Sequence, residues 1–259
     1  MAVDDDGGTG LPASIEAAWG LRERPNKGPK RGLSLERIVE AAMKVAAADG
    51  LAAVSMGRVA ADLGVSTMAL YRYVAAKDEL LELMLDAASG PPPAAPAPEE
   101  GWRGGLSRWA WAELGAFRRH PWALRIPISG PPTTPNQIAW LERGLRCLRD
   151  TGLEEGEKLA VILLLTGFVR NWATLEADLA EASRSSGAVA QAAMSGYGRM
   201  LARLTDPARF PALHAVIEAG VLDQTGLDDP DEEFVFGLER VLDGIEALVR
   251  ARAPAPPGG

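Results

Sequence analysis

Apolar residues recur every three or four positions along most of this 259-residue chain, and the two-residue alternation typical of half-buried strands is nearly absent. Between Ser34, a suitable N-cap, and Gly50, a glycine placed to end a helix, the apolar residues fall on one helical face. The pattern predicts an all-α fold. The expected helices span residues 35–49, 56–63, 67–74, 77–88, 102–119, 135–150, 153–183, 187–204, 207–219 and 230–252.

Three of these helices have a strong start signal, in which an N-cap residue precedes a proline at the first helical position. Proline suits this position because its fixed φ is helical and its missing N–H would be unpaired there anyway. The pairs are Thr134–Pro135, Asp206–Pro207 and Asp229–Pro230. Residues 89–101 contain five prolines instead, which predicts a linker.

The composition argues against several classes of protein. A single cysteine, Cys147, cannot form an intramolecular disulfide or a thiolate-rich zinc site, and two histidines leave little for a metal centre. The longest apolar run, residues 159–169, is too short to span a bilayer. The acidic N-terminus lacks the apolar segment of a secretory signal. We therefore expect a cytoplasmic protein without a bound metal or cofactor.

Charge is distributed unevenly along the chain. The formal net charge is −8, yet residues 22–77 contain ten Lys or Arg against five Asp or Glu, a net +5 that leaves −13 for the rest. A basic module joined to an acidic body is expected of an acidic protein that binds a polyanion. An ordinary solvated surface is the alternative, because charge patterning alone is weakly informative.

Residues 55–74 have the layout of a helix-turn-helix, with two short helices joined by a tight turn at Gly64. If Leu70 and Val74 face inward, Arg72 projects from the outer face of the second helix. An arginine there can bind guanine O6 and N7 in the major groove. Because the same corner occurs in many helical proteins, a generic three-helix packing unit is the alternative from geometry alone.

Residues 33–88 closely resemble the DNA-binding domain of the tetracycline-repressor (TetR) family. The matching features are the Ala-rich first helix ending in ADG, the S-M-x-x-V-A-x-x-L-G-V segment, the L-Y-R-Y-V run and the K-D-E-L-L start of the next helix. The later chain resembles the ligand-binding and dimerisation domain of the tetracycline-repressor-like branch more loosely. Those matches lie at 120–122, 135–142, 148–153 and 234–246. The whole resemblance covers roughly residues 19–252.

The resemblance implies a homodimeric transcription regulator, most often a repressor, that reads an inverted-repeat operator with half-sites about 34–36 Å apart. Gly57 departs from the family pattern, since some members have a base-reading arginine there, so Arg58 or Arg72 is expected to supply part of the specificity. The expected DNA-contacting residues are Ser55, Arg58, Ser66, Thr67, Met68, Ala69, Tyr71, Arg72, Tyr73 and Lys77.

A basic arm precedes the first helix of this domain. Lys27, Lys30 and Arg31 within it are further candidates for contact with phosphate or an adjacent minor groove, and a disordered tail is the alternative.

We divide the chain into five segments. The first, residues 1–32, is a flexible and partly basic arm, in which Ile15, Ala18 and Trp19 lie on one side of a short amphipathic piece. The others are the helix-turn-helix DNA-binding domain (33–88), the Pro-rich linker (89–101), the helical ligand-binding and dimerisation domain (102–252) and a disordered tail (253–259).

Six of the seven tryptophans fall between residues 102 and 172. An aromatic core is the plainer interpretation, and an apolar ligand cavity oriented by a few polar groups is the functional one. His120, Arg170 and Asn171 are the candidate polar groups. The candidate ligand-binding residues are Trp102, Trp109, Phe117, His120, Trp140, Phe168, Asn171 and Trp172. The expected ligand is bulky and aromatic or polycyclic.

The last predicted helix has a wide apolar stripe, which with the helix around residues 159–169 resembles the four-helix bundle through which the family dimerises. Burial of this helix within one subunit is the alternative. The candidate interface residues are Phe234, Leu238, Val241, Leu242, Ile245 and Leu248.

These features favour a homodimeric repressor that binds a palindromic operator and is released by a small ligand. An enzyme is poorly supported, because the chain has no G-x-S-x-G motif, P-loop or histidine cluster. A sensor or adaptor that has lost operator recognition and a transcriptional activator are the two alternatives. DNA, a second copy of the chain and a small-molecule effector are thus the expected partners.

Overall fold

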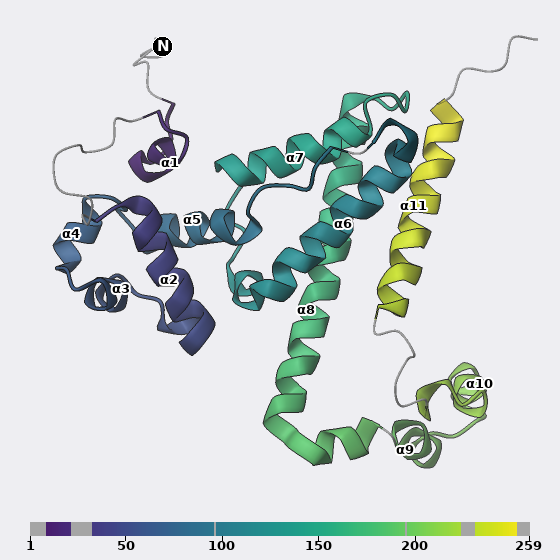
Figure 1. The fold of residues 1–259 in the computed structure, drawn as a ribbon. Helices are drawn as coiled ribbons and strands as arrows, with labels where there is room; N and C mark the ends of the chain where they lie inside the picture. The colour runs from purple at the N-terminus through teal and green to yellow at the C-terminus, as the bar shows by residue number, and fades with distance from the viewer. Residues whose placement is uncertain (1–8, 22–32, 96, 195, 224–230, 253–259) are drawn as a thin grey trace, which may run out of the picture. The chain divides into compact units, whose positions relative to one another are not determined.

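The computed structural model of the chain describes residues 9–21, 33–95, 97–194, 196–223 and 231–252 (Figure 1). Every regular element within these residues is helical, which confirms the all-α prediction.

The chain divides into two compact units. Unit 1 comprises residues 1–173 and 245–259, and unit 2 comprises residues 174–244. Two helices contribute to both units, α8 (Glu155–Met194) and α11 (Glu232–Arg252). The predicted linker at 89–101 lies inside unit 1, so the predicted DNA-binding domain and the first part of the predicted body belong to the same unit.

The N-terminal part of unit 1 contains four helices close to their predicted positions. Three begin at the expected serine caps, since the side-chain oxygens of Ser34, Ser55 and Ser66 each accept a hydrogen bond of 3.2–3.3 Å from the backbone N–H three residues on. The predicted third helix is shorter than expected, ending at Tyr71 rather than near Val74. The four are α2 (Leu35–Asp49), α3 (Met56–Leu63), α4 (Thr67–Tyr71) and α5 (Lys77–Ser89).

Gly64 makes the sharp corner between α3 and α4. Its φ of 68° is left-handed, which a residue with a side chain rarely adopts, and it ends α3 as predicted. The corner closes over a core in which Ile38, Leu70, Leu80 and Met84 are fully buried. Because these side chains come from α2, α4 and α5, the core fixes the helix-turn-helix on α5.

A short helix, α1 (Ala13–Ala18), lies in the segment expected to be a flexible arm. Ile15 is fully buried in the core formed with α2 and α5, and Ser14 Oγ donates a 2.6 Å hydrogen bond to Glu79 of α5. Trp19 Nε1 donates to the carbonyl of Thr133 at 2.7 Å. The predicted amphipathic piece is therefore an ordered helix that joins α5 to the loop before α7 (Pro135–Cys147).

Packing of α6 (Gly101–Arg119) against α7 builds the middle of unit 1. Trp109 of α6 meets Trp140 of α7 edge-on, with ring centroids 5.7 Å apart, and its Nε1 donates to the Trp140 carbonyl at 3.0 Å. Gly144 allows α7 and α8 to approach closely, because a Cβ atom there would lie 2.7 Å from Cδ1 of Ile162.

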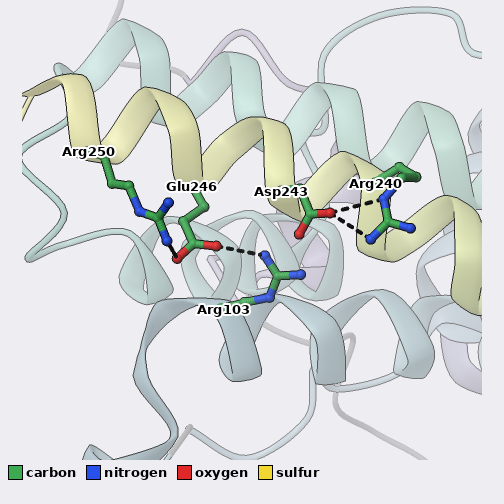
Figure 2. Close-up of polar contacts among 5 residues, drawn as sticks. All are labelled: Arg103, Arg240, Asp243, Glu246 and Arg250. Carbon is green, nitrogen blue, oxygen red and sulfur yellow. Dashed lines mark hydrogen bonds and ion pairs between the residues drawn. The ribbon is translucent and has the colours of Figure 1, made fainter.

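The C-terminal end of α11 is held to unit 1 by ion pairs. Figure 2 shows Glu246 between two arginines, with Arg103 of α6 at 3.3 Å and Arg250 of its own helix at 2.6 Å. Arg252 binds Glu157 at the start of α8 through Nε at 3.1 Å. These pairs fix the end of α11 against both α6 and α8.

Unit 2 differs from the predicted helix boundaries. The long helix continues to Met194, past its predicted end at 183 and into the start of the predicted 187–204 helix. The remainder of that predicted helix forms α9 (Tyr197–Leu204), and the next helix is α10 (Pro211–Glu218).

The helix predicted to start at Pro207 begins instead at Pro211. The Asp206 carboxylate accepts the Ala208 N–H at 3.0 Å, and the Asp206 carbonyl accepts the Phe210 N–H at 2.9 Å, so the chain makes one closed turn there. The Asp229–Pro230 start signal lies outside the described residues.

Residues Glu155–Ser185 of α8 are long and apolar enough, by length and composition alone, to cross a membrane. A core helix of a soluble protein passes the same test. Side chains of this helix contribute to the core of unit 1, where Leu165 and Val169 are fully buried, and its arginine at 170 binds backbone carbonyls within the same unit. These contacts anchor the first part of α8 in unit 1.

Candidate functional site

Several of the side chains predicted to contact DNA lie on α4 and at its C-cap. Met68 is 73% exposed, Tyr71 is 46% exposed, and Arg72 at the C-cap is exposed as well. Thr67 and Ala69 are half-buried on the same helix. This exposed surface follows from the burial of Leu70, which orients the remainder of the short helix away from the core.

The N-terminal ends of the nearby helices present groups suited to phosphate. Lys77 at the start of α5 is exposed. Ser55 and Ser66 use their side-chain oxygens as hydrogen-bond acceptors in their caps, which leaves each hydroxyl proton available to donate. Lys27, Lys30 and Arg31 of the predicted basic arm lie outside the described residues.

Two predicted DNA contacts are occupied within the chain. Arg58 pairs with Asp62 at 3.2 Å and with Asp49 at 2.9 Å, and these carboxylates raise its pKa. The Tyr73 hydroxyl donates to the Leu33 carbonyl at 2.9 Å, with the ring half-buried. Of the two arginines expected to replace a base-reading residue at position 57, Arg72 is therefore the better placed.

Unit 1 also contains a cavity of about 750 Å³. Its walls come from α5, α6, α7, α8 and the loop at residues 126–132, and most of the lining side chains are apolar. On α8 the lining residues follow a helical stripe at Leu159, Ile162, Leu163, Thr166 and Arg170. A space of this size accepts a ligand of several fused rings.

Three of the eight predicted ligand-binding residues line this cavity: Trp109, Phe117 and Trp140. The other five do not line it: Trp102, His120, Phe168, Asn171 and Trp172. Phe168, Asn171 and Trp172, for example, lie on α8 but off the stripe that faces the cavity.

Two charged residues of the lining are Arg170, which the sequence analysis includes among the polar candidates, and Glu113, which it does not include. Glu113 lies on α6 one turn after Trp109 and one turn before Phe117, a spacing that places all three on one face. Burial raises the pKa of Glu113 to about 8, and the charge of Arg170 only partly opposes this shift. Its Oε2 atom is inaccessible to solvent and has no hydrogen-bond partner.

Arg170 supports the 126–132 loop, which lines part of the cavity. Its Nη2 donates to the carbonyls of Leu124 and Ile126, both at 3.0 Å, and its guanidinium lies 5.7 Å from the ring centroid of Phe117. Burial lowers the pKa of Arg170. Arg170 thus acts as a structural cation that fixes the start of the 126–132 loop.

Helix α5 joins the cavity to the helix-turn-helix. The Asp86 carboxylate accepts the backbone N–H groups of Asn136 at 2.8 Å and Gln137 at 3.1 Å, which caps the N-terminus of α7. Pro135 takes the first helical position as predicted, but the N-cap Thr134 makes no side-chain capping bond. The capping group therefore comes from α5 rather than from the local sequence.

The predicted dimer stripe is largely covered within one chain. Phe234, Leu238, Leu242 and Ile245 are at most 3% exposed, and only Val241 and Leu248 are half-buried. The exposed large apolar residues of α11 are instead Val235 and Phe236, and on the unit 2 part of α8 they are Leu175 and Leu179. No cluster of metal-ligating side chains occurs among the described residues.

A helix-turn-helix whose supporting helix also forms the wall of an apolar cavity defines a one-component transcription regulator, in which one chain contains the DNA-binding and the ligand-binding part. The family model for bacterial regulatory proteins of the tetR family matches residues 38–84, and the model for the tetracyclin repressor-like C-terminal domain matches residues 95–249. The chain belongs to the TetR family. It is a DNA-binding transcriptional regulator and not an enzyme, as the sequence predicts.

Individual relatives agree with this assignment. The transcriptional repressor DrrR1 of Streptomyces coeruleorubidus is 38% identical over 263 residues, which cover 96% of this chain and 95% of DrrR1. Apo ActR of Streptomyces coelicolor is 28% identical and matches 88% of this chain and 100% of its own with a TM-score of 0.71. ActR in complex with actinorhodin matches 84% of this chain and 99% of its own, with 28% identity and a TM-score of 0.70.

Proposed function

We propose that this chain is a cytoplasmic homodimeric repressor that binds an inverted-repeat operator and is released when a bulky aromatic ligand enters the cavity of unit 1. The observation that carries the proposal is the position of α5. One face of this helix packs under α2 and α4, and another face forms part of the cavity wall. A ligand that displaces α5 would therefore also displace the recognition helix.

The chemistry of the cavity supports an aromatic ligand. Trp109, Phe117 and Trp140 provide aromatic walls, and few polar groups compete with them. ActR, which shares the fold and 28% of its residues with this chain, has been crystallised with actinorhodin and with (S)-DNPA. We infer that the ligand of this chain is also a compound of fused or linked aromatic rings.

Operator recognition is assigned mainly to α4. Arg72 would bind a guanine in the major groove, and Met68 and Tyr71 would make the apolar and edge contacts around it. Thr67, Ser55, Ser66 and Lys77 would bind phosphate and set the register of the helix.

The coupling between the two sites is a difference in affinity between two conformations. If the ligand prefers the conformation in which α5 is displaced, operator binding must weaken ligand binding by the same factor. The hydrogen bonds from α7 to Asp86 connect α5 directly to another wall of the cavity.

The experiment begins with selection of a random duplex library by the purified full chain. An enriched inverted repeat, bound by a species with the mass of two chains, supports the dimeric operator-binding function. Aromatic compounds are then screened for release of the selected duplex, with a Trp109→Ala and Phe117→Ala double variant to enlarge the cavity. Release that depends on these two side chains supports the cavity as the effector site.

The purified chain and the selected operator also distinguish the two alternative functions, a sensor or adaptor and an activator. Folded protein that enriches no sequence at low salt would identify a sensor or adaptor that keeps the fold. Operator binding accompanied by increased reporter expression would identify an activator.

A further inference from the structure

Glu113 is the most unusual polar group of the cavity. Its neighbours along the α6 face are aromatic, its Oε2 is inaccessible to solvent, and no hydrogen-bond partner reaches that atom. An unpaired buried oxygen is unfavourable, because the desolvation of the group is not compensated. A ligand that offers the missing partner would therefore gain affinity at this point of the wall.

The protonation of Glu113 decides what kind of partner fits. Burial favours the uncharged acid, and the pKa of about 8 keeps most of the group protonated at neutral pH. The protonated carboxyl has an O–H group to donate. Arg170 does not satisfy Glu113 Oε2, which has no hydrogen-bond partner, and its Nη2 donates to the Leu124 and Ile126 carbonyls.

The remaining charges of the lining disfavour an anionic ligand. Asp78 and Glu82 reach the cavity from α5, and Arg170 on α8 is the one basic residue of the lining. The parts of α7 and of the 126–132 loop that line the cavity contribute no ionisable side chain. An uncharged ligand with a hydrogen-bond acceptor avoids the repulsion and the desolvation that an anion would meet.

We propose that Glu113 is the polar recognition group of the cavity and that, as an uncharged acid, it donates a hydrogen bond to a ketone or quinone oxygen of a neutral aromatic ligand. The inference rests on the proposed effector cavity and adds to it the chemical class of the group that is recognised. It assigns the acceptor end of the ligand to the α6 wall, between Trp109 and Phe117.

The test compares two tricyclic compounds that differ by one carbonyl oxygen, 9-fluorenone and fluorene. Equilibrium dialysis against the full chain measures the affinity of each compound. For the unaltered chain, we expect 9-fluorenone to bind roughly tenfold more tightly than fluorene, the factor that one buried hydrogen bond supplies.

Two variants of Glu113 separate its hydrogen bond from its volume. Glu113→Gln keeps a donor of nearly the same shape, so the preference for 9-fluorenone should persist. Glu113→Leu removes the donor, so the two compounds should bind within about twofold of each other. Thermal unfolding checks that both variants fold. The comparison of 9-fluorenone with fluorene in the unaltered chain tests the inference even if a variant fails to fold.

The pH dependence supplies an independent readout. As pH rises through 8, Glu113 loses its proton, so the affinity for 9-fluorenone should fall while that for fluorene stays nearly constant. Glu113→Gln should abolish this dependence. That variant keeps Asp78, Glu82 and Arg170, so a pH effect that disappears with it belongs to Glu113.

Three outcomes would overturn the inference. The first is fluorene binding as tightly as 9-fluorenone to the unaltered chain, which leaves the cavity proposal intact. The second is a ketone preference that survives in Glu113→Leu or rises with pH. The third is that neither compound binds the folded chain, in which case the proposed effector cavity fails and this inference fails with it.

Discussion

Arg72 and Arg58 are separated by 14 positions and belong to the same helix-turn-helix, yet their surroundings leave only Arg72 well placed to bind a DNA base. Arg58 is paired with two carboxylates, whereas Arg72 is exposed at the end of α4. The sequence shows both as basic residues near the turn. Arg58 pairs with Asp62 one turn on in α3, and the packing of α3 against the end of α2 adds Asp49, whereas Arg72 has neither carboxylate beside it.

For Arg72→Ala, we expect a loss of about 1–3 kcal/mol in operator binding and a relaxed preference at one base pair, because a bidentate contact to guanine is removed. Arg58→Ala is the matched control and should leave base preference unchanged. Competition binding with single-base variants of the selected operator measures both. Unchanged affinity and unchanged preference in Arg72→Ala would refute the assignment.

Glu113 should also make the stability of the chain depend on pH. Its pKa of about 8 in the fold is raised above the ordinary value, so between that ordinary value and pH 8 the folded state holds a proton that the unfolded state has released. The free energy of unfolding should therefore fall with rising pH in this window, by up to about 1.4 kcal/mol per pH unit.

The measurement is urea unfolding of the unaltered chain and Glu113→Gln at about pH 5, 6.5 and 8. The amide cannot ionise, so the stability of the variant relative to the unaltered chain should increase steadily across the series. Parallel curves for the two proteins would show that Glu113 is ionised in the fold.

At the scale of elements, most local signals in the sequence predict the observed helix ends, whereas contacts between distant residues leave no such signal. Serine caps and the Gly64 corner depend on residues within a few positions of each other, so the sequence predicts them. The cap of α7 depends on Asp86, which is 50 positions away from Asn136. The late start of α10 has a local cause, but the Asp206–Pro207 pair fits a tight turn and a helix start equally well.

Asp86→Ala should cost about 1–3 kcal/mol of stability, since it leaves two backbone N–H groups of α7 without their charged acceptor. It should also reduce the factor by which an effector weakens operator binding. Unfolding and operator titrations with and without effector measure the two effects. Asp150→Ala, at an exposed position, is the control, and an equal loss in both variants would contradict the capping role.

Helix α1 gives a second prediction at this scale. Ile15→Ala should destabilise the chain by about 2–5 kcal/mol, because a fully buried side chain is truncated in the core beside α5. Leu21→Ala, at a residue 63% exposed, should change stability by less than about 0.5 kcal/mol. Chemical denaturation of both variants decides between an ordered helix and a loosely attached arm.

At the scale of the whole molecule, the sequence gives the family and the fold class but only part of the cavity. Trp109, Phe117 and Trp140 were predicted because aromatic residues at helical spacing are visible in a sequence. Glu113 was missed because a single glutamate on a helix reads as a solvated residue. The dimer stripe was placed on side chains that the single chain already buries, since apolar periodicity does not say what covers a face.

The proposed dimer should depend on apolar residues that a single chain leaves exposed. Replacing Leu175 and Leu179 of α8 by Glu should reduce the sedimentation mass to one chain and weaken operator binding about 100-fold or more, since two linked half-site contacts become one. Leu204→Glu, at a residue 71% exposed on α9, is the control. A double variant that retains the mass of two chains would place the interface elsewhere.

Because α5 both lines the cavity and supports the helix-turn-helix, it restricts how a chain of this kind can acquire a new effector. Six of its residues shape the ligand space, and the opposite side of the same helix seats the DNA-reading corner. A change of ligand preference made on this wall therefore alters repression before any ligand arrives. The lining residues of α7 and α8 are not part of the core that seats this corner, so changes there avoid the side effect. Evolution and engineering toward new compounds have most freedom on those walls, and α5 is the part that they must leave nearly as it is.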